Sequence, residues 1–383
     1  MMPLASLHDI FGDLVIYRDL DPIDCRLPRF AESHLGMGIP GPVRPRKLEP
    51  AYAQAMAWLL HRARALDAPD VELAELVYLG DTALNDGLAF RNLRETSGWR
   101  GWAFIGSERN GDLLVSKLDG VYSANRWTAL ADFISWLLDQ GAALDARTAV
   151  VVDVDKTALG ARGRNDASID RARMAALEAT MAAALGPAFN EPEFRRAYAE
   201  INTPKYHTFT VDNQDNVAYV CLVLGTGVYT LEGVRGALET GTLGTFREFI
   251  EQVDGARDRL SPAFRALHSD VLSRVRAGDP TPFKEFRQRE CRETVGRMGY
   301  LPDQAPLAQR LAEEICLTRE VVEVAHWLRA RGCLLIALSD KPDEATNPSP
   351  ELAAEGFLPL HRTTTHTVGQ SIAGLLPNVG DDQ

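Results

Sequence analysis

Apolar residues along this chain fall into two patterns, short continuous runs and longer segments with helical spacing. The continuous runs predict strands buried on both faces, at 76–79, 149–152 and 333–338. Each run follows a segment whose spacing predicts a helix, at 49–66, 128–138 and 321–330. Shorter strands are expected at 102–105 and 357–362, and shorter helices at 87–95 and 350–355. This alternation is typical of an α/β fold with a doubly wound parallel, Rossmann-like sheet.

The pattern changes between residues 158 and 316, where most segments have helical spacing. Helices are expected at 169–185, 191–201, 246–253, 262–277, 282–298 and 305–315. A crossover between parallel strands usually takes about a dozen residues and a helix, so this block is too long to be one. We therefore expect a mainly helical domain, 158–316, inserted between two parts of the sheet domain, 1–157 and 317–368. We expect residues 369–383 to form a disordered tail.

Composition and charge narrow the function classes. Of the 383 residues, 45% are hydrophobic and 25% are charged, as in ordinary globular proteins. The formal net charge of -12 argues against a general affinity for nucleic acid or for anionic membranes. The five cysteines are scattered without zinc-site spacing, the first residues lack a signal-peptide pattern, and no apolar stretch is long enough to cross a bilayer. We therefore expect a cytoplasmic location and no structural zinc.

Two aspartates directly follow the strand at 149–152. They are Asp153 and Asp155, with Thr157 two residues further on. Because side chains alternate along a strand, both carboxylates should leave its carboxyl end on the same side. Open α/β sheets bind their ligands at that end, and two carboxylates beside a hydroxyl suit Mg²⁺ and a phosphate. Asp is also common at strand ends because it favours turns and helix caps, so this motif alone is only moderately specific.

Further polar residues occupy the other strand ends and one helix start. Lys47 precedes the first predicted helix, and Asp81 and Asp86 follow the first buried strand in the sequence GDTALND. Ser339 and Lys341 follow the last buried strand. We expect the acidic turn and the aspartates after residue 152 to converge on a single divalent cation.

Together these motifs resemble those of the haloacid dehalogenase (HAD) superfamily of phosphotransferases. That family combines a DxDx[TV] strand, a strand ending in Ser or Thr, a Lys at a helix start and an acidic GDxxxxD-type loop. All four motifs are present, but this chain begins with Lys47 and the acidic loop, whereas the family begins with DxDxT. A circular permutation that joins the predicted strand 357–362 to the loop carrying Lys47 restores the family order. Residues 158–316 then fall where the family carries its cap domain.

The resemblance implies a Mg²⁺-dependent phosphatase or phosphotransferase that acts through an aspartyl-phosphate. It makes Asp153 the nucleophile and Asp155 the acid and base. It assigns the metal to Asp153, Asp155, Asp81 and Asp86, and the phosphate to Thr157, Ser339 and either Lys47 or Lys341. Lys47 is favoured because the family's lysine precedes the acidic loop by one helix. Dehalogenase relatives lack the second aspartate, so phosphoryl chemistry is favoured over carbon–halogen hydrolysis.

Several weaker signals leave the substrate open. Arg162 and Arg164, shortly after the nucleophile motif, either bind a substrate anion or are solvated. A polar loop within 158–316 is either an element that determines substrate specificity or an ordinary surface loop. The residues of this loop that could contact a substrate are Lys205, His207, Asp212 and Asp215. The glycines at 225–233 lack a dinucleotide fingerprint, and His361 and His366 lack the spacing of a metal site.

The expected substrate is a small phosphorylated molecule, and the sequence does not indicate an oligomeric state. Two alternatives stay open. One is a non-catalytic HAD-like module that binds a ligand or a partner. The other is a phosphotransferase that acts on nucleic-acid ends, which the acidic composition disfavours.

Overall fold

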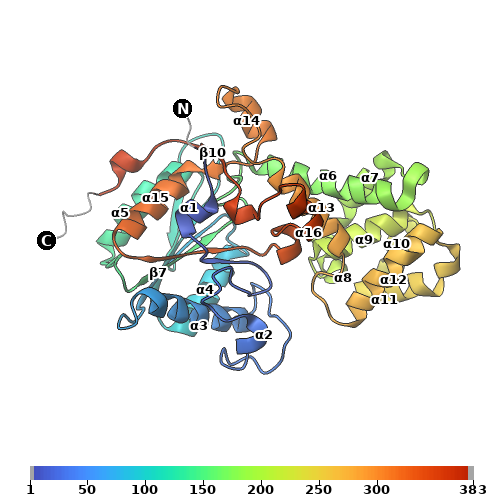
Figure 1. Ribbon diagram of the computed structural model, residues 1–383, viewed down its shortest axis with the longest axis horizontal. Helices are drawn as coiled ribbons and strands as arrows, with labels where there is room; N and C mark the ends of the chain where they lie inside the picture. The colour runs from blue at the N-terminus through green and yellow to red at the C-terminus, as the bar shows by residue number, and fades with distance from the viewer. Residues whose placement is uncertain (1–3, 378–383) are drawn as a thin grey trace. The chain divides into compact units, whose positions relative to one another are not determined.

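The structure is a computed structural model that describes residues 4–377 (Figure 1). The chain forms two compact units. One, the sheet unit, contains the residues up to Arg171 and from Thr294 onward, and the other, the helical unit, is Ala172–Glu293. The described part of the chain contains no helix with the length and apolar character needed to cross a bilayer.

The helical unit is narrower than the predicted insertion of 158–316, because both flanking segments belong to the sheet unit. Asn165 ties these two segments together. Its amide group donates to the carbonyl oxygens of Leu311 and Glu314, each at 2.8 Å, and its side-chain oxygen accepts from the N–H of Cys316 at 2.9 Å. A pattern of helical spacing cannot reveal such contacts, since they depend on one polar side chain.

The sheet unit is built on a seven-stranded sheet in which every neighbouring pair is parallel except the last. In spatial order the strands are β2 (Val15–Ile16), β9 (Leu334–Leu338), β7 (Thr148–Asp153), β3 (Glu75–Gly80), β4 (Arg100–Gly106), β6 (Val121–Ala124) and β5 (Val115–Leu118). The predicted α/β fold with a mostly parallel sheet is therefore confirmed. The antiparallel edge strand β5 was not expected, because its residues are exposed and form no continuous apolar run.

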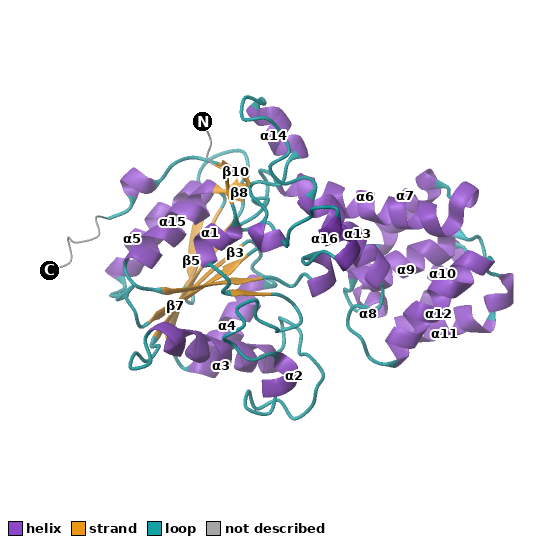
Figure 2. Ribbon diagram, in the orientation of Figure 1, coloured by secondary structure: helices purple, strands orange, loops and turns teal. Residues whose placement is uncertain are grey.

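Helices cover both faces of this sheet (Figure 2). One face carries α3 (Pro50–Asp67) and α4 (Asp86–Ser97), and the other carries α5 (Leu130–Asp139) and α15 (Arg319–Ala330). On the first face, Tyr52, Leu59 and Phe90 belong to one apolar core with strand residues such as Val151. Each such buried side chain stabilises the fold by roughly 1.5–3 kcal/mol.

The strand register brings three strand ends together. Leu79 of β3 lies beside Val152 of β7, and Asp153 of β7 lies beside Leu338 of β9. The strands run in the same direction, so their carboxyl ends share one edge of the sheet. The segments that follow them begin at Asp81, Val154 and Ser339, which places the predicted polar motifs at neighbouring positions.

The strand predicted at 357–362 is wrong. Residues Leu360–Arg362 form a short 3₁₀ turn, η6, and the strand β10 lies further on at Thr365–Val368. Pro359 precedes the turn, and the carbonyl of Pro359 accepts from the N–H of Thr363 at 3.1 Å, which closes it. In a separate three-stranded sheet, β10 lies between β1 (Leu4–Ala5) and β8 (Leu317–Thr318).

The predicted disordered tail does not begin at residue 369. Backbone N–H groups of Ile372 and Ala373 donate to one carboxylate oxygen of Glu323, at 2.6 and 2.8 Å. The indole N–H of Trp327 donates to the carbonyl of Pro377 at 2.7 Å. These hydrogen bonds to Glu323 and Trp327 anchor the segment on α15. Residues 378–383 lie outside the described part of the chain.

The remaining helices of the sheet unit are short. They are α1 (Leu7–Phe11), α2 (Phe30–Ser33), α14 (Leu307–Glu313) and α16 (Pro350–Ala354). The helical unit is entered by α6 (Asp166–Leu185) and left by α13 (Lys284–Val295). Between them lie α7 (Glu191–Ile201), α8 (His207–Thr210), α9 (Gln214–Gly225), α10 (Leu231–Glu239), α11 (Phe246–Gly255) and α12 (Pro262–Arg276).

The sequence missed α9 because this helix has no polar face along its length. Its residues 217–224 are all buried in a core that also contains Phe249 and Phe264. The discounted glycine segment at 225–233 joins α9 to α10, and the hydroxyl of Thr230 caps α10 by accepting from the N–H of Gly233 at 3.1 Å. Those residues therefore serve as a helix junction.

Candidate active site

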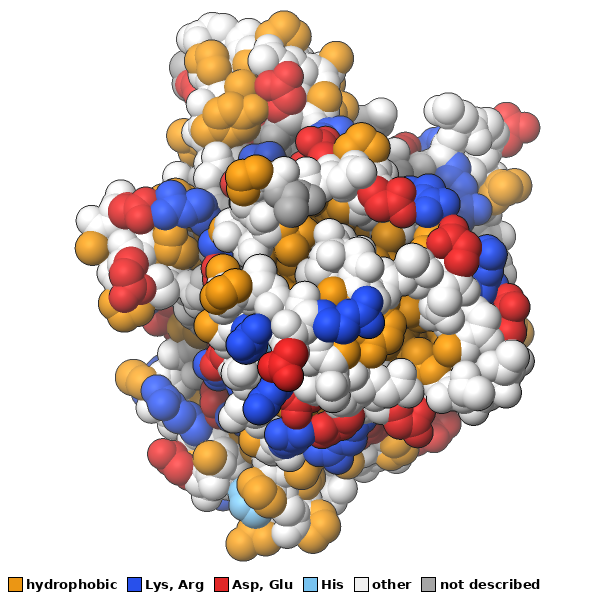
Figure 3. Space-filling model, turned by 90° about the vertical axis from the view of Figure 1, so that its right-hand side faces the viewer, with side chains coloured by type: hydrophobic (Ala, Val, Ile, Leu, Met, Phe, Trp, Pro, Cys, Tyr) orange, Lys and Arg blue, Asp and Glu red, His pale blue; other side chains and the backbone are white. Residues whose placement is uncertain are grey.

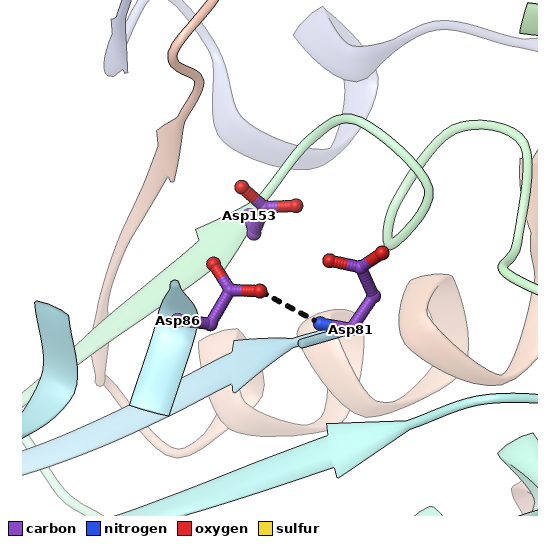
Figure 4. A group of neighbouring side chains, drawn as sticks. All are labelled: Asp81, Asp86 and Asp153. Carbon is purple, nitrogen blue, oxygen red and sulfur yellow. Dashed lines mark hydrogen bonds between the residues drawn. The ribbon is translucent and has the colours of Figure 1, made fainter. Parts of the chain in front are cut away.

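Three buried carboxylates meet at the shared edge of the sheet (Figure 4). Asp153 is the last residue of β7, Asp81 follows β3, and Asp86 is the first residue of α4. One oxygen atom from each side chain lies within 4.8 Å of the others. The side chains turn toward one another in Figure 4, and their residues are 5%, 9% and 1% exposed.

The turn between β3 and α4 positions Asp86. Its Oδ2 accepts hydrogen bonds from the N–H groups of Asp81 and Thr82, at 3.0 and 2.9 Å, and from the Thr82 hydroxyl at 3.1 Å. The Tyr78 hydroxyl, from within β3, donates to the other oxygen, Oδ1, at 3.3 Å. Gly80 permits this closure, because a Cβ there would lie 2.5 Å from the Cβ of Asp86. The sequence GDTALND thus folds into a compact acidic turn.

Two side-chain cations compensate the three carboxylates. The Nζ of Lys47 lies 2.8 Å from Oδ1 of Asp86 and 2.7 Å from Oδ1 of Asp153. The Nε of Arg162 donates to Oδ2 of Asp81. Lys47 is itself buried, and buried charges are stable only when they are paired in this way.

The pKa values reflect a shortage of positive charge. Burial raises the pKa of Asp81 to about 7, and repulsion from Asp86 adds to this effect. Burial also raises the pKa of Asp153 well above its usual range, where repulsion from Asp86 and Asp81 opposes the attraction of Lys47. For Asp86 the balance is reversed: burial would raise the pKa, but Lys47 and the hydrogen bonds of the turn lower it. An additional cation would therefore favour the ionised form of the whole cluster.

Lys47 is affected in the opposite sense by the same contacts. Burial alone would lower the pKa of this lysine, but Asp153 and Asp86 together raise it well above its usual value. The ammonium group therefore stays charged inside the site, where it holds two carboxylates at hydrogen-bonding distance.

The donor set fits a hard divalent cation. Three carboxylate oxygens from separate segments converge, and hard cations such as Mg²⁺ and Ca²⁺ take oxygen ligands of this kind. Sulfur and imidazole, which softer metals prefer, are not part of this group. The geometry does not select Mg²⁺ among the hard divalent cations.

Asp155 does not join the three carboxylates. Its Oδ2 lies 3.5 Å from the Nζ of Lys341, and its side chain is partly exposed. The Ser339 hydroxyl accepts from the N–H of Lys341 at 3.1 Å and is fully buried. Asp155, Lys341 and Ser339 thus form a second polar group beside the end of β9, and the predicted nucleophile, Asp153, is contacted by Lys47 at 2.7 Å.

Thr157 is buried, and its hydroxyl is among the buried side-chain oxygens without a hydrogen-bond partner in the described residues. Its carbonyl oxygen accepts from the Thr318 hydroxyl at 2.5 Å, which fixes the backbone. The hydroxyl is therefore available to an additional group, as the prediction of a phosphate contact requires.

The two predicted substrate arginines have different surroundings. Arg162 contacts Asp81 in the cluster, as described above. Arg164 forms ion pairs at 2.9 Å with Glu108 and with the fully buried Glu320. Those contacts give Arg164 a structural role between segments of the sheet unit.

The other weak candidates also have structural partners. In the helical unit, the Asp215 carboxylate is buried and pairs with Arg287 at 2.6 Å. Lys205, His207 and Asp212 are exposed; Lys205 lies in a short 3₁₀ turn, and His207 begins α8. In the sheet unit, Nδ1 of His366 lies 2.6 Å from Oε1 of Glu314, and Nε2 of His361 lies 3.5 Å from Oδ1 of Asp13. Each of these histidines therefore contacts an acidic side chain within the fold.

Two hydroxyl groups that support the cluster were not predicted from the sequence. Tyr78 and Thr82 both contact Asp86. A third buried hydroxyl, that of Tyr52, has no hydrogen-bond partner among the described residues. Thr82 lies inside the GDTALND motif, so its position could have drawn attention to it. Tyr78 and Tyr52 lie in apolar patterns that predict only core packing.

Comparisons with known proteins add no assignment: no family model matches the chain, and neither a curated protein nor a solved structure matches it.

Proposed function

We propose that the protein is a phosphoryl hydrolase or phosphotransferase that depends on a divalent cation, with Asp153 as its nucleophile. The observation that carries the proposal is the meeting of Asp153, Asp81 and Asp86 at one edge of a parallel sheet, with Lys47 between Asp153 and Asp86. Ligands of open α/β sheets bind at this edge. The chemistry of the group, three carboxylates and one ammonium, suits a cation and a phosphoryl group together.

The proposed reaction has two steps. An oxygen of the Asp153 carboxylate attacks phosphorus, and the bond from phosphorus to the leaving oxygen breaks while Asp155 gives that oxygen a proton. A water molecule then attacks the phosphorus of the aspartyl-phosphate while Asp155 takes a proton from the water. The bond from phosphorus to the Asp153 oxygen breaks, inorganic phosphate is released and the Asp153 carboxylate is restored. Lys47, Ser339 and Thr157 donate to the phosphoryl oxygens, where they stabilise negative charge in the transition state.

Asp81, Asp86 and Asp153 would hold the divalent cation, and Mg²⁺ is our first candidate. When bound, such a cation supplies positive charge to the carboxylates and to the phosphoryl oxygens. The two aspartates whose pKa values are raised by burial have the greatest need for that charge.

The proposal extends to a circularly permuted relationship with the HAD superfamily, with the helical unit in the place of a cap. The sheet order supports it, because the strands that end in the acidic turn and in Ser339 flank β7. The pairing of β1 with β10 also supports it, since segments near the two ends of the described chain lie side by side. Permutation is tolerated best where chain ends lie close together.

We propose a small phosphorylated molecule as the substrate. Lys and Arg side chains are interspersed with Asp and Glu on the face shown in Figure 3, and the net charge is -12. A mixed, acidic surface supports this choice over a nucleic-acid end, because nucleic-acid binding depends on concentrated positive charge.

A second candidate function is a non-catalytic binding module. It is favoured by one observation: Lys47 and Arg162 already compensate the cluster, as in a structural ion-pair network. Such a network would need no divalent cation and would not turn over a phosphate ester.

The experiment that separates these candidates measures phosphate release from an aryl phosphate and from a panel of phosphorylated metabolites, with and without Mg²⁺. Asp153→Asn should reduce turnover by about a thousandfold or more, because the nucleophilic oxygen is lost. Asp145→Asn, at the exposed turn before β7, is the matched control and should keep the wild-type rate. Full activity of Asp153→Asn, or a folded wild type that is inactive on every substrate, would overturn the proposal.

A further inference from the structure

Arg162 sits in a loop that fixes its backbone and leaves its side chain partly exposed. Its carbonyl oxygen accepts from the N–H of Glu108 at 2.8 Å and from the indole N–H of Trp127 at 3.2 Å. Its own N–H donates to the carbonyl of Lys156 at 2.8 Å. The side chain is 35% exposed, whereas the backbone is held by these three hydrogen bonds.

The glycines on either side of Arg162 explain why the loop can approach so closely. Gly163 has a φ of +76°, and a Cβ there would lie 2.0 Å from the carbonyl oxygen of Glu108. Gly160 has a φ of +63°, and a Cβ there would lie 2.4 Å from a side-chain atom of Ile169. The sequence GARGRN thus places one arginine at a defined point beside the acidic turn.

At that point the guanidinium group pairs with Asp81. The other two carboxylates share Lys47, which is buried and lies between them. Asp81 is therefore the carboxylate whose compensating cation comes from a partly exposed side chain. A divalent cation could reach Asp81 by displacing Arg162, which is less buried than Lys47.

A divalent cation bound to Asp81 would compete with this ion pair. Hard cations bind carboxylate oxygens at about 2.0–2.6 Å, which is closer than a guanidinium group can approach. Two cations on one carboxylate repel each other, and partial burial reduces the screening of that repulsion by solvent. This repulsion weakens the contact of each group with Asp81 while the other is present.

We propose that Arg162 is a displaceable counter-ion, which holds Asp81 when no divalent cation is bound and releases it when the cation binds. The freed guanidinium group, anchored at its backbone beside the site, then binds an oxygen of the phosphoryl group. Guanidinium groups recognise phosphate by paired hydrogen bonds, so the released side chain has a suitable acceptor nearby. This inference rests on the proposed function, since it requires the three carboxylates to bind a cation.

The test is the affinity of the full-length protein for Mn²⁺, measured by calorimetric titration without substrate. Arg162→Gln should bind Mn²⁺ about tenfold more tightly than the wild type, because the competing charge is gone. Arg109→Gln, at an exposed arginine one residue beyond Glu108, is the matched control and should leave the affinity unchanged. Circular dichroism of each variant establishes that it is folded.

A second titration, with inorganic phosphate at saturating Mn²⁺, tests the other half of the proposal. Arg162→Gln should bind phosphate about tenfold more weakly, since one charge-assisted contact is lost. Unchanged or weaker Mn²⁺ binding by Arg162→Gln would overturn the competition, and unchanged phosphate binding would overturn the role after release. If the wild type and every variant fail to bind Mn²⁺, the proposed cation site fails as well, which distinguishes the two claims.

Discussion

At the scale of single residues, Lys47 shows how this site keeps charge in the interior. Its ammonium group is buried but lies within 2.8 Å of two carboxylates, and it forms an ion pair with each of them. Removing one partner of such a buried group typically costs 3–5 kcal/mol, because the remaining charge is left unpaired. The site therefore depends on the whole set of charges rather than on any one pair.

A separate residue, His361, predicts how the stability of the sheet unit depends on pH. Burial lowers the pKa of His361 to about 4, the nearby Arg362 adds to this, and Asp13 only partly opposes it. The unfolded chain therefore binds a proton near pH 6.5 that the folded protein does not accept until about pH 4. The contribution of this histidine to stability is complete above pH 6.5 and declines as the pH falls from there toward 4.

We expect the wild type to lose about 1–2 kcal/mol of unfolding free energy between pH 7 and pH 5 through this group. Urea unfolding at the two pH values, compared with His361→Gln, measures this contribution. A variant that loses as much stability as the wild type over the same interval would show that the histidine does not carry the effect.

The residue scale also shows where sequence reasoning ends. Alternation along a strand predicted that Asp153 and Asp155 would point to the same side, but β7 ends at Asp153. Lys156 has a positive φ of +63°, so the chain turns sharply there. Asp155 consequently pairs with Lys341 outside the three-carboxylate group. The sequence indicates that Asp153 and Asp155 follow a buried strand. The direction in which each side chain points depends on the backbone angles of the turn after β7.

At the scale of elements, the junction of β3 and α4 controls the geometry of the cluster. We expect Gly80→Ala to destabilise the protein by about 1–3 kcal/mol, as overpacked cores usually do. The added Cβ would lie 2.5 Å from the Cβ of Asp86, so the start of α4 must move. Mn²⁺ binding should weaken with it, because Asp86 is one of the three converging carboxylates.

Gly87→Ala is the matched control for this substitution. The nearest atom to a Cβ at position 87 is 3.7 Å away, at the end of the Arg91 side chain, so the extra methyl group fits. Alanine also favours the helix relative to glycine. Urea unfolding and Mn²⁺ titration of both variants measure the effect, and equal behaviour of the two would contradict the proposed role of the close approach at Gly80.

The long buried strands and their preceding helices were predictable as elements because apolar runs and helical spacing are strong signals. The predicted run at 357–362 failed because Pro359 closes a turn, and the threonines that follow it form β10 instead. The fully buried helix α9 has no polar face and therefore no helical periodicity. Buried strands and helices with one solvated face could be predicted, whereas a helix buried on all sides and a local turn could not.

At the scale of the whole molecule, the sequence predicted an interrupted sheet and a helical insertion, and the structure divides the chain into a sheet unit and a helical unit. The limits of the insertion could not be predicted, because Asn165 joins segments 146 and 149 positions apart in sequence. The convergence of Lys47, Asp81, Asp86 and Asp153 followed from placing each at a strand end or a helix start. The position of Arg162 could not be predicted from the sequence, since it depends on a loop packed against Glu108.

The most direct test of the central claim is to trap the covalent intermediate on Asp153. The wild type is mixed with Mg²⁺ and excess aryl phosphate, quenched with acid and treated with borohydride, which reduces an aspartyl-phosphate to homoserine. Trypsin releases the peptide 148–156, which contains both Asp153 and Asp155, and fragmentation in a mass spectrometer locates the change. We predict homoserine at position 153 and an unchanged Asp155. Phosphate release with an unmodified Asp153, or with the change at another carboxyl group, would contradict the account.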